Sequence, residues 1–403
     1  MSFIRKAFQQ LAKRFDKRGL QHEIDTHRLF LLTEYHARLA SGIEMDENQI
    51  ASISRQAEEL EIPGMRQELA QHLHRQVALI THQLDILICG KDSQNLAEEP
   101  TVLPVERPGG DSAAAPERAP RQRGLWGAAA RSGSASARQV APESLQQEDA
   151  LESEQGACRG TSLVGSGISM SALSSAFQDR HGFSLTLAPS AIEHPRAGIG
   201  VWLQGRASAG AVIGFYPGIV YTKAHYRDMP GYPKVDRQSD YLIARYDGAV
   251  LDAKPWGRGA LEPAQSAQSL GYTGQQAVVL QQLLQKERRH PLALGHYANH
   301  PPPGKHPNAL VAAYDYPAGS TGLSKHMQRY IPSVMFSHNS QQRGEGESAL
   351  REARSTHVLC LLLVASRDIE NEELLLNYRL SPGAERPDWY TPVDAVEEKR
   401  RWA

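Results

Sequence analysis

Through most of the first 90 residues, apolar side chains recur at spacings of three and four, the pattern of amphipathic helices. This pattern predicts helices over 26–43 and 51–88. The pair Pro63-Gly64 predicts a break within the second stretch, because proline and glycine interrupt helical backbone. We therefore expect residues 1–90 to form a helical region.

This region contains a group of histidines: His22, His27, His36, His72, His74 and His82. They raise the possibility of a metal site, but His72 and His74 are two positions apart and point to different sides of a helix. We interpret the group as solvated helix side chains, and we predict no metal site.

From about residue 176 the pattern changes to short apolar runs separated by Gly, Pro, Asn and Asp, which predicts strands and turns. The runs read GIGVWL, AVIGFYPGIVY, YLIARYDGAVLDA, NALVAAYDY, HVLCLLLVA and EELLLNY. One helical stretch, 275–289, interrupts them. Many short strands with few helices argue against a doubly wound parallel sheet and favour several small sheets, hence an α+β fold. Cys360 lies within an apolar run and is interpreted as a buried core thiol.

Between these two regions the hydrophobic periodicity disappears. The stretch is rich in Pro, Gly, Ala and Ser, and it cannot bury enough apolar surface to offset the entropy of ordering. We predict a disordered linker over 91–175, with a second domain over 176–383 and a tail over 384–403.

Charge and composition then narrow the function. Lys and Arg number 44 and Asp and Glu number 45, giving a net charge of −1, so no global field favours nucleic acid and we predict no nucleic-acid partner. The 3 cysteines lie far apart, which excludes a disulfide framework or a Cys-only zinc site and fits a reducing compartment. No run of about 18 apolar residues occurs, so we predict no transmembrane segment.

The segment 1–18 is basic and amphipathic. It fits the first helix of a soluble bundle, a mitochondrial presequence, or a helix that binds a membrane surface or acidic partner. We expect an intracellular protein, with cytoplasm, nucleus and mitochondrion all open. The sequence does not set the oligomeric state.

Three motifs carry the candidate chemistry. Gly198 and Gly200 precede a strand, where glycine permits a close backbone approach to a ligand or simply a tight turn. Asn299 and His300 lie on an irregular loop, because the prolines that follow exclude a helix. The third motif, 368–378, has acids before an apolar run that ends in Tyr, and it predicts a turn followed by a short strand.

Taken in order, these motifs resemble the SET domain of protein lysine methyltransferases. RAGIGVWL is similar to the opening Gly-x-Gly motif, GAVIGFYPGIVY to the next strand, and DYLIARYDGAVLDA to the paired strands after it. LGHYANH with Pro307-Asn308 is similar to the Asn-His…Pro-Asn motif, and NEELLLNY to the Glu-Glu-Leu…Tyr motif. The resemblance implies a SET-like β-clip domain of several small sheets, with a variable insert over 254–291 that contacts substrate.

The resemblance also implies a chemistry: methyl transfer from S-adenosylmethionine to a lysine side chain of a protein or peptide. Tyr378 is then the candidate catalytic residue that lines the lysine channel, and Tyr241 is a second candidate. The implied cofactor-binding residues are Arg196, Gly198, Ile199, Gly200, Trp202, Asn299, His300 and Tyr378.

Some positions depart from the family pattern. The loop between Asn299 and Asn308 is longer than usual, Asn371 replaces a usual Gly, and Asn377 replaces a usual Asp. These departures motivate a second interpretation, a catalytically weak SET-fold protein that binds a cofactor or partner. A third is a helical scaffold whose C-terminal domain is merely structural. No Cys-rich segment follows Tyr378, and we expect Trp389 or Tyr390 of the tail to cover the site instead.

Overall fold

Helical periodicity near the N-terminus corresponds to helices in the computed structural model, which describes residues 21–89, 169–235, 241–256, 278–280, 282–283, 290–316, 327–336, 358–380 and 386–402. The helices are α2 (Gln21–Ala40), α3 (Glu47–Glu59) and α4 (Ile62–Cys89). The Asp46 side chain caps α3 by accepting a hydrogen bond from the Gln49 amide, 2.8 Å away. The predicted break falls slightly earlier, at Leu60, because Pro63 is tolerated in the first turn of α4. Segment 1–18 lies outside the described residues.

Helix α5 (Met170–His181) corrects the predicted linker boundary. The Ser169 hydroxyl accepts a hydrogen bond from the Ala172 amide, and Gly182 ends the helix in the left-handed conformation at φ 92°. The linker prediction missed this helix because its apolar face is narrow. The rest of the predicted linker lies outside the described residues, and the remaining domain division stays a prediction.

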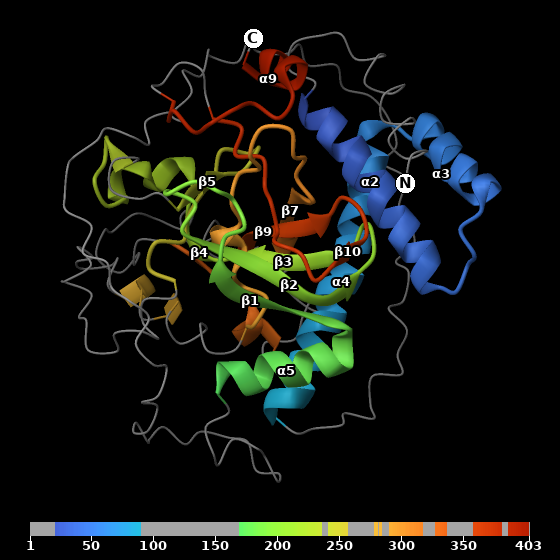
Figure 1. Ribbon diagram of the computed structural model, residues 1–403, viewed down its shortest axis with the longest axis horizontal. Coiled ribbons are helices and arrows are strands. Elements are labelled where there is room, and N and C mark those ends of the chain that lie inside the picture. The colour runs from blue at the N-terminus through green and yellow to red at the C-terminus, as the bar shows by residue number, and fades with distance from the viewer. Residues whose placement is uncertain are drawn as a thin grey trace, which may run out of the picture.

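Three small sheets follow, which confirms the predicted α+β fold (Figure 1). The first contains β1 (Phe183–Pro189), β2 (Ile199–Ala207) and β10 (Ile369–Glu370) in the order β1-β2-β10. The second contains β3 (Val212–Tyr216), β9 (Val358–Ala365) and β7 (Ala309–Tyr316) in the order β3-β9-β7. The third contains β5 (Leu242–Ala244), β6 (Val250–Asp252), β4 (Gly218–Tyr221) and β8 (Ser333–Met335) in the order β5-β6-β4-β8. Only the pairing of β4 with β8 is parallel among the described strands.

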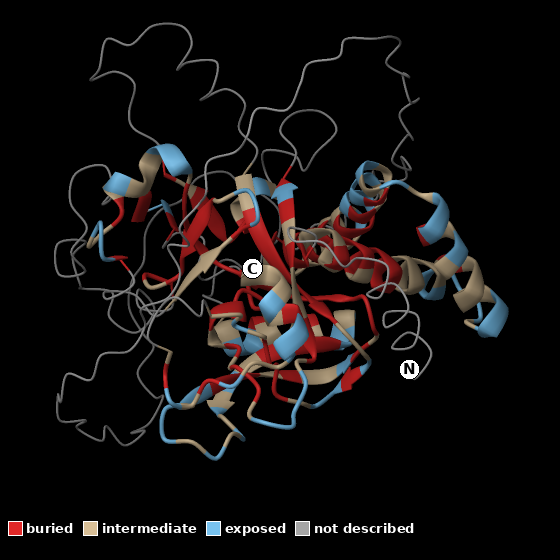
Figure 2. Ribbon diagram, turned by 90° about the horizontal axis from the view of Figure 1, so that it is seen from above, coloured by how far each residue is buried: buried red, intermediate tan, exposed pale blue. Residues whose placement is uncertain are grey.

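The apolar run in β9 forms the centre of the molecule. Its side chains are buried from Cys360 to Ala365, and β3 and β7 pair with it on either side. Cys360 is fully buried, as expected, and burial raises the pKa of its thiol to about 12, so it carries no thiolate at neutral pH. Figure 2 shows this buried centre, with exposed residues along α3 and α9 (Ala395–Trp402).

The helical region packs directly on the sheets, and its histidines take part in the contact. His36 Nδ1 lies 2.9 Å from the Ser208 hydroxyl, and His74 Nδ1 lies 2.6 Å from the Tyr314 hydroxyl. His27 and His72 are buried. The prediction of solvated histidines is therefore wrong for these four, because the helix face that carries them meets other elements of the fold.

The predicted helical insert is only partly described. Residues 278–280 and 282–283 are helical, as predicted, and Val279, Leu280 and Leu283 are buried. The remainder of 257–289 lies outside the described residues. Among the described helices, none is both long and apolar enough to cross a membrane.

Candidate active site

The two glycines meet different local requirements, and only Gly198 precedes β2 as predicted, because Gly200 is the second residue of that strand and pairs with Ala188. Gly198 adopts φ 55°, in the left-handed region that glycine enters without steric cost. At Gly200 a Cβ would lie 2.2 Å from Glu373 Oε1 and 3.3 Å from Asn299 Nδ2. Glycine is required there because two side chains, one from each later motif, approach the strand backbone.

The Asn299 amide joins the first two motifs. Its Nδ2 atom donates to the carbonyl oxygens of Ala197 at 3.2 Å and Ile199 at 3.4 Å. It also contacts Glu373 Oε1 at 3.2 Å. One side chain thus holds the Gly-x-Gly backbone against the third motif.

Glu373 is buried at the centre of this junction. Besides Asn299, its carboxylate accepts hydrogen bonds from the Ser190 hydroxyl at 2.7 Å and the Ala191 amide at 2.8 Å. Glu373 belongs to the third motif, but no role was predicted for it from the sequence. The only signal was a pair of acids, Glu372 and Glu373, directly before an apolar run, and this pattern is too common to identify a functional residue.

Asn308 fixes the third motif through its backbone. This buried side chain donates to the Glu373 carbonyl and accepts from the Leu375 amide, both at 2.8 Å. The Leu374 amide in turn donates to the Val201 carbonyl at 2.8 Å. The segment therefore runs between β2 and the loop of the second motif.

The prediction of a short strand over EELLLNY is only approximately met. Asn371 adopts φ 49° in a turn, and its side chain accepts a hydrogen bond from the Gly205 amide at 2.8 Å. The residues that follow make isolated bridges to three partners, Trp202, Asn299 and Ala309, instead of a continuous strand. Asparagine tolerates this left-handed position, which explains how it replaces the glycine of the family pattern.

His300 connects the second motif to Tyr378. Its Nδ1 atom accepts from the Tyr378 amide at 3.3 Å, and its Nε2 atom donates to the Thr391 carbonyl at 2.8 Å. A neutral imidazole with its proton on Nε2 satisfies both contacts. Burial lowers the pKa of His300, partly offset by the hydrogen bond to Thr391, which favours this neutral form.

Tyr378 lies at the surface of the junction. Its side chain is 39% exposed, and its hydroxyl donates to the Ala298 carbonyl at 3.1 Å. The tail contributes two rings: Tyr390 lies 4.6 Å from His300 between ring centroids, and Trp389 lies 6.1 Å from Tyr378. The tail thus approaches the site through the two aromatic residues that the sequence indicated.

Tyr241 belongs to an aromatic cluster with Tyr216, His296 and Tyr297. Its ring centroid lies 5.7 Å from His296 and 6.1 Å from Tyr297, and its carbonyl accepts from the Tyr216 hydroxyl at 2.9 Å. Burial raises the pKa of Tyr216, and Tyr378, Asp252 and Tyr241 add to this effect. No role was predicted from the sequence for Tyr216, which stands in the run GAVIGFYPGIVY, or for His296.

Arg196 and Trp202 flank the Gly-x-Gly segment. Arg196 is exposed on the loop before β2, and its backbone amide donates to His194 Nδ1 at 3.2 Å. Trp202 pairs with Thr186 across β1 and β2. Its indole Nε1 is buried and has no hydrogen-bond partner among the described residues.

The structure brings together the three motifs on which the resemblance to the SET domain rests. No family model matches the chain, but known proteins are similar to part of it. The chain is similar to SET domain-containing protein 9 of Homo sapiens, with 29% identity over 213 residues, 49% of this chain and 58% of the relative. It is equally similar to SET domain-containing protein 9 of Pongo abelii, with 29% identity over 213 residues and 64% of that relative. The chain thus matches less than two thirds of each relative's length.

Proposed function

We propose that the protein is an S-adenosylmethionine-dependent methyltransferase that acts on lysine side chains of proteins. The observation that carries the proposal is the Asn299 side chain, which bonds both the Gly-x-Gly backbone and Glu373. It draws together segments that the chain separates by roughly 75 to 175 positions.

The residues around this junction fit the cofactor. A side chain at Gly198 would meet nothing within 4 Å, so the backbone there is open to a ligand. The buried Trp202 indole N–H, without a partner among the described residues, is a donor available to a ligand. With Arg196, Ile199, Gly200, Asn299 and His300, these residues would hold the cofactor. S-adenosylmethionine, when bound, supplies an electrophilic methyl group on a sulfonium cation.

The aromatic residues fit the other substrate. A lysine amine attacks only in its neutral form, and its ordinary pKa is about 10.4. An apolar channel disfavours the ammonium, and a nearby cation disfavours it further. Tyr378 and Tyr241 would line this channel, with the Tyr378 hydroxyl orienting the amine. Such a reaction gains mostly from positioning and needs little acid–base machinery.

One observation favours the weaker alternative, a SET-fold protein that binds without efficient transfer. The Asn299 amide protons are directed at internal acceptors, two carbonyls and one carboxylate. In that alternative the junction is a structural bond, and cofactor affinity comes from other residues.

Calorimetric titration with S-adenosylhomocysteine, followed by automethylation with tritiated S-adenosylmethionine, tests both candidates. The proposed enzyme binds the product and labels itself or an added protein. Tyr378→Phe should then remain folded, bind the product as the wild type does, and lose most transfer. Binding without label supports the weaker alternative, and no binding at all contradicts both.

The substrate contacts are expected on the insert, 254–291. Trp256, at its described start, is buried, so it contributes to the core and is a poor candidate for a peptide contact. Substitutions at the described residues of the insert do not test this part of the proposal. Deletion of residues 257–277 tests it, because the shortened protein should transfer less label to other proteins but still bind S-adenosylhomocysteine.

A further inference from the structure

Arg379 directly follows Tyr378 and has an unusual backbone. Its φ is 52°, a left-handed conformation that a residue with a side chain adopts only when its surroundings enforce it. The Arg379 amide donates to Asn377 Oδ1 at 3.1 Å, which closes a tight turn around Tyr378. The direction of the chain at Tyr378 therefore depends on what holds Arg379.

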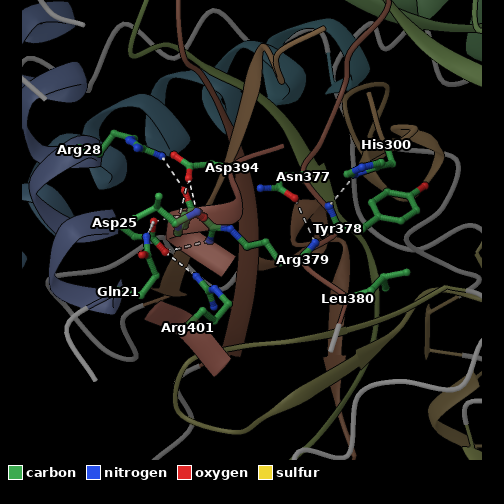
Figure 3. Close-up of polar contacts among 12 residues, drawn as sticks. Gln21, Asp25, Arg28, His300, Asn377, Tyr378, Arg379, Leu380, Asp394 and Arg401 are labelled. Atoms are coloured by element: carbon green, nitrogen blue, oxygen red, sulfur yellow. Dashed lines mark hydrogen bonds and ion pairs between the residues drawn. The ribbon is translucent and has the colours of Figure 1, made fainter. Parts of the chain in front are cut away.

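The Arg379 guanidinium is held by acids from both ends of the chain. It makes a two-pronged contact with Asp25 of α2, at 2.8 and 2.9 Å, and an ion pair with Glu397 of α9 at 2.7 Å. Arg401 of α9 also pairs with Asp25, at 2.8 Å. Figure 3 shows the side chains of Arg379 and Tyr378 on opposite sides of the same segment, with Asp25 and Arg401 around the guanidinium.

This cluster is only partly exposed to solvent. The side chains of Asp25 and Glu397 are 18% and 10% exposed, and that of Arg379 is 24% exposed. Arg379 and Arg401 together lower the pKa of Asp25 despite its burial, so the carboxylate stays charged at neutral pH. A two-pronged arginine–carboxylate contact fixes direction as well as distance, unlike a single ion pair.

We propose that Asp25 and Arg379 are positioning residues for Tyr378, an inference that rests on the proposed methyltransferase function. Neither touches the reacting atoms. Asp25 and Glu397 hold Arg379 in its left-handed turn, and this turn sets where the Tyr378 ring and hydroxyl lie. Helix α2, although outside the three sheets, thereby determines the geometry of the site.

The test is a double-mutant cycle in the full-length chain, read by automethylation with tritiated S-adenosylmethionine. Asp25→Asn should lower the first-order rate by about tenfold, because small misplacements of a reacting geometry are costly. Its affinity for S-adenosylhomocysteine should change by less than about twofold. In a Tyr378→Phe background the same change should have almost no further effect, because residues that act through one group are not additive.

Three further variants separate positioning from stability. Asp25→Glu should restore most of the rate, and Arg379→Lys, which keeps charge but loses the two-pronged contact, should lower it as Asp25→Asn does. Glu34→Gln is the matched control, because it removes an ion pair of the same helix, Glu34 with Arg38 at 2.7 Å, away from Tyr378. It should leave the rate unchanged.

A readout without activity keeps this inference distinct from the proposed function. Fluorotyrosine placed at position 378 should give one sharp fluorine resonance, which Asp25→Asn shifts or broadens and Glu34→Gln does not. If the wild type transfers no methyl group but the resonance responds, the function fails and the positioning stands. If the resonance is unchanged by Asp25→Asn, or if the cycle is additive, the positioning role is overturned.

Discussion

Asn299, Asn308 and Glu373 hold the first part of the site through hydrogen bonds made inside the sheet-bearing domain, whereas Tyr378 and Arg379 depend on ion pairs to helices from both ends of the chain. We call the part of the site held by Asn299, Asn308 and Glu373 the threaded half, and the part formed by Tyr378 and Arg379 the clamped half. The first is built from amides, carbonyls and the buried Glu373 carboxylate, which salt in solution screens little. The second is built from charges that are partly exposed. The comparison shows that one site can combine a rigid part with a part whose geometry depends on helices that are distant in the sequence.

Acid should weaken the loop that leads into the threaded half. Burial lowers the pKa of both His290 and His296 to about 3, against about 6.5 in the unfolded chain. Between these values the unfolded chain binds protons that the native state does not, so stability falls as the pH falls. At pH 5 we expect a loss of about 2 kcal/mol for each, or about 4 kcal/mol together, compared with pH 7.5.

Urea unfolding at the two pH values measures this loss. His290→Phe, which keeps a ring against Phe215, removes one titrating group and should roughly halve this contribution to the pH dependence. An identical pH dependence in wild type and variant would contradict the burial argument.

Asn308→Ala in the threaded half should lower the free energy of unfolding more than any single substitution in the clamped half does. It leaves the Glu373 carbonyl and the Leu375 amide buried without their partner. Each orphaned group costs about 1–3 kcal/mol, so we expect a loss of about 3 kcal/mol in the free energy of unfolding. Chemical denaturation checks this, and a loss below that of Glu397→Gln would reverse the ranking.

Glu397→Gln should weaken the clamped half by a smaller amount. It removes a charge that pairs with Arg379 at 2.7 Å but leaves Asp25 in place. For a partly exposed pair we expect about 1 kcal/mol. Thermal unfolding measures the stability, and hydrogen exchange should locate the change at 377–380 and not at 373–376.

Salt should have the smallest effect of these changes, and it should act on the clamped half and not on the threaded half. Raising NaCl from about 0.05 to 1 M shortens the screening length to about 3 Å and weakens partly exposed ion pairs. Exchange of the Tyr378 and Arg379 amides should accelerate about threefold, while that of Leu374 and Leu375 stays constant. Equal acceleration in both segments would remove the distinction.

Turn residues and short apolar runs are local signals, and they predicted the small sheets. The convergence of Gly200 with Asn299 was expected only from the family resemblance. It missed α5, whose apolar face is narrow, and it misjudged His36 and His74, whose partners belong to distant elements. Local periodicity indicates that one face of a helix is apolar, but not which element covers it.

The clamped half was beyond sequence reasoning for the same reason. Asp25 and Arg379 lie 354 positions apart, and nothing near either residue marks the other as its partner. The left-handed turn at Arg379 was not predictable from the sequence either, because arginine has no preference for the left-handed conformation. By contrast, Trp389 and Tyr390 were expected near the site from the resemblance, because the chain has no Cys-rich segment after Tyr378 and its tail supplies aromatic side chains instead.

Gly210 has a consequence for how the protein can be divided. A side chain there would lie 1.9 Å from the Leu32 carbonyl of α2, so helix backbone and the turn between β2 and β3 touch without any intervening group. Gln76 of α4 also bonds the Gly210 carbonyl at 3.1 Å and the Val212 amide at 2.6 Å. A recombinant fragment that begins at Ser169 would expose this contact surface to solvent. We therefore expect the C-terminal portion expressed alone to be insoluble.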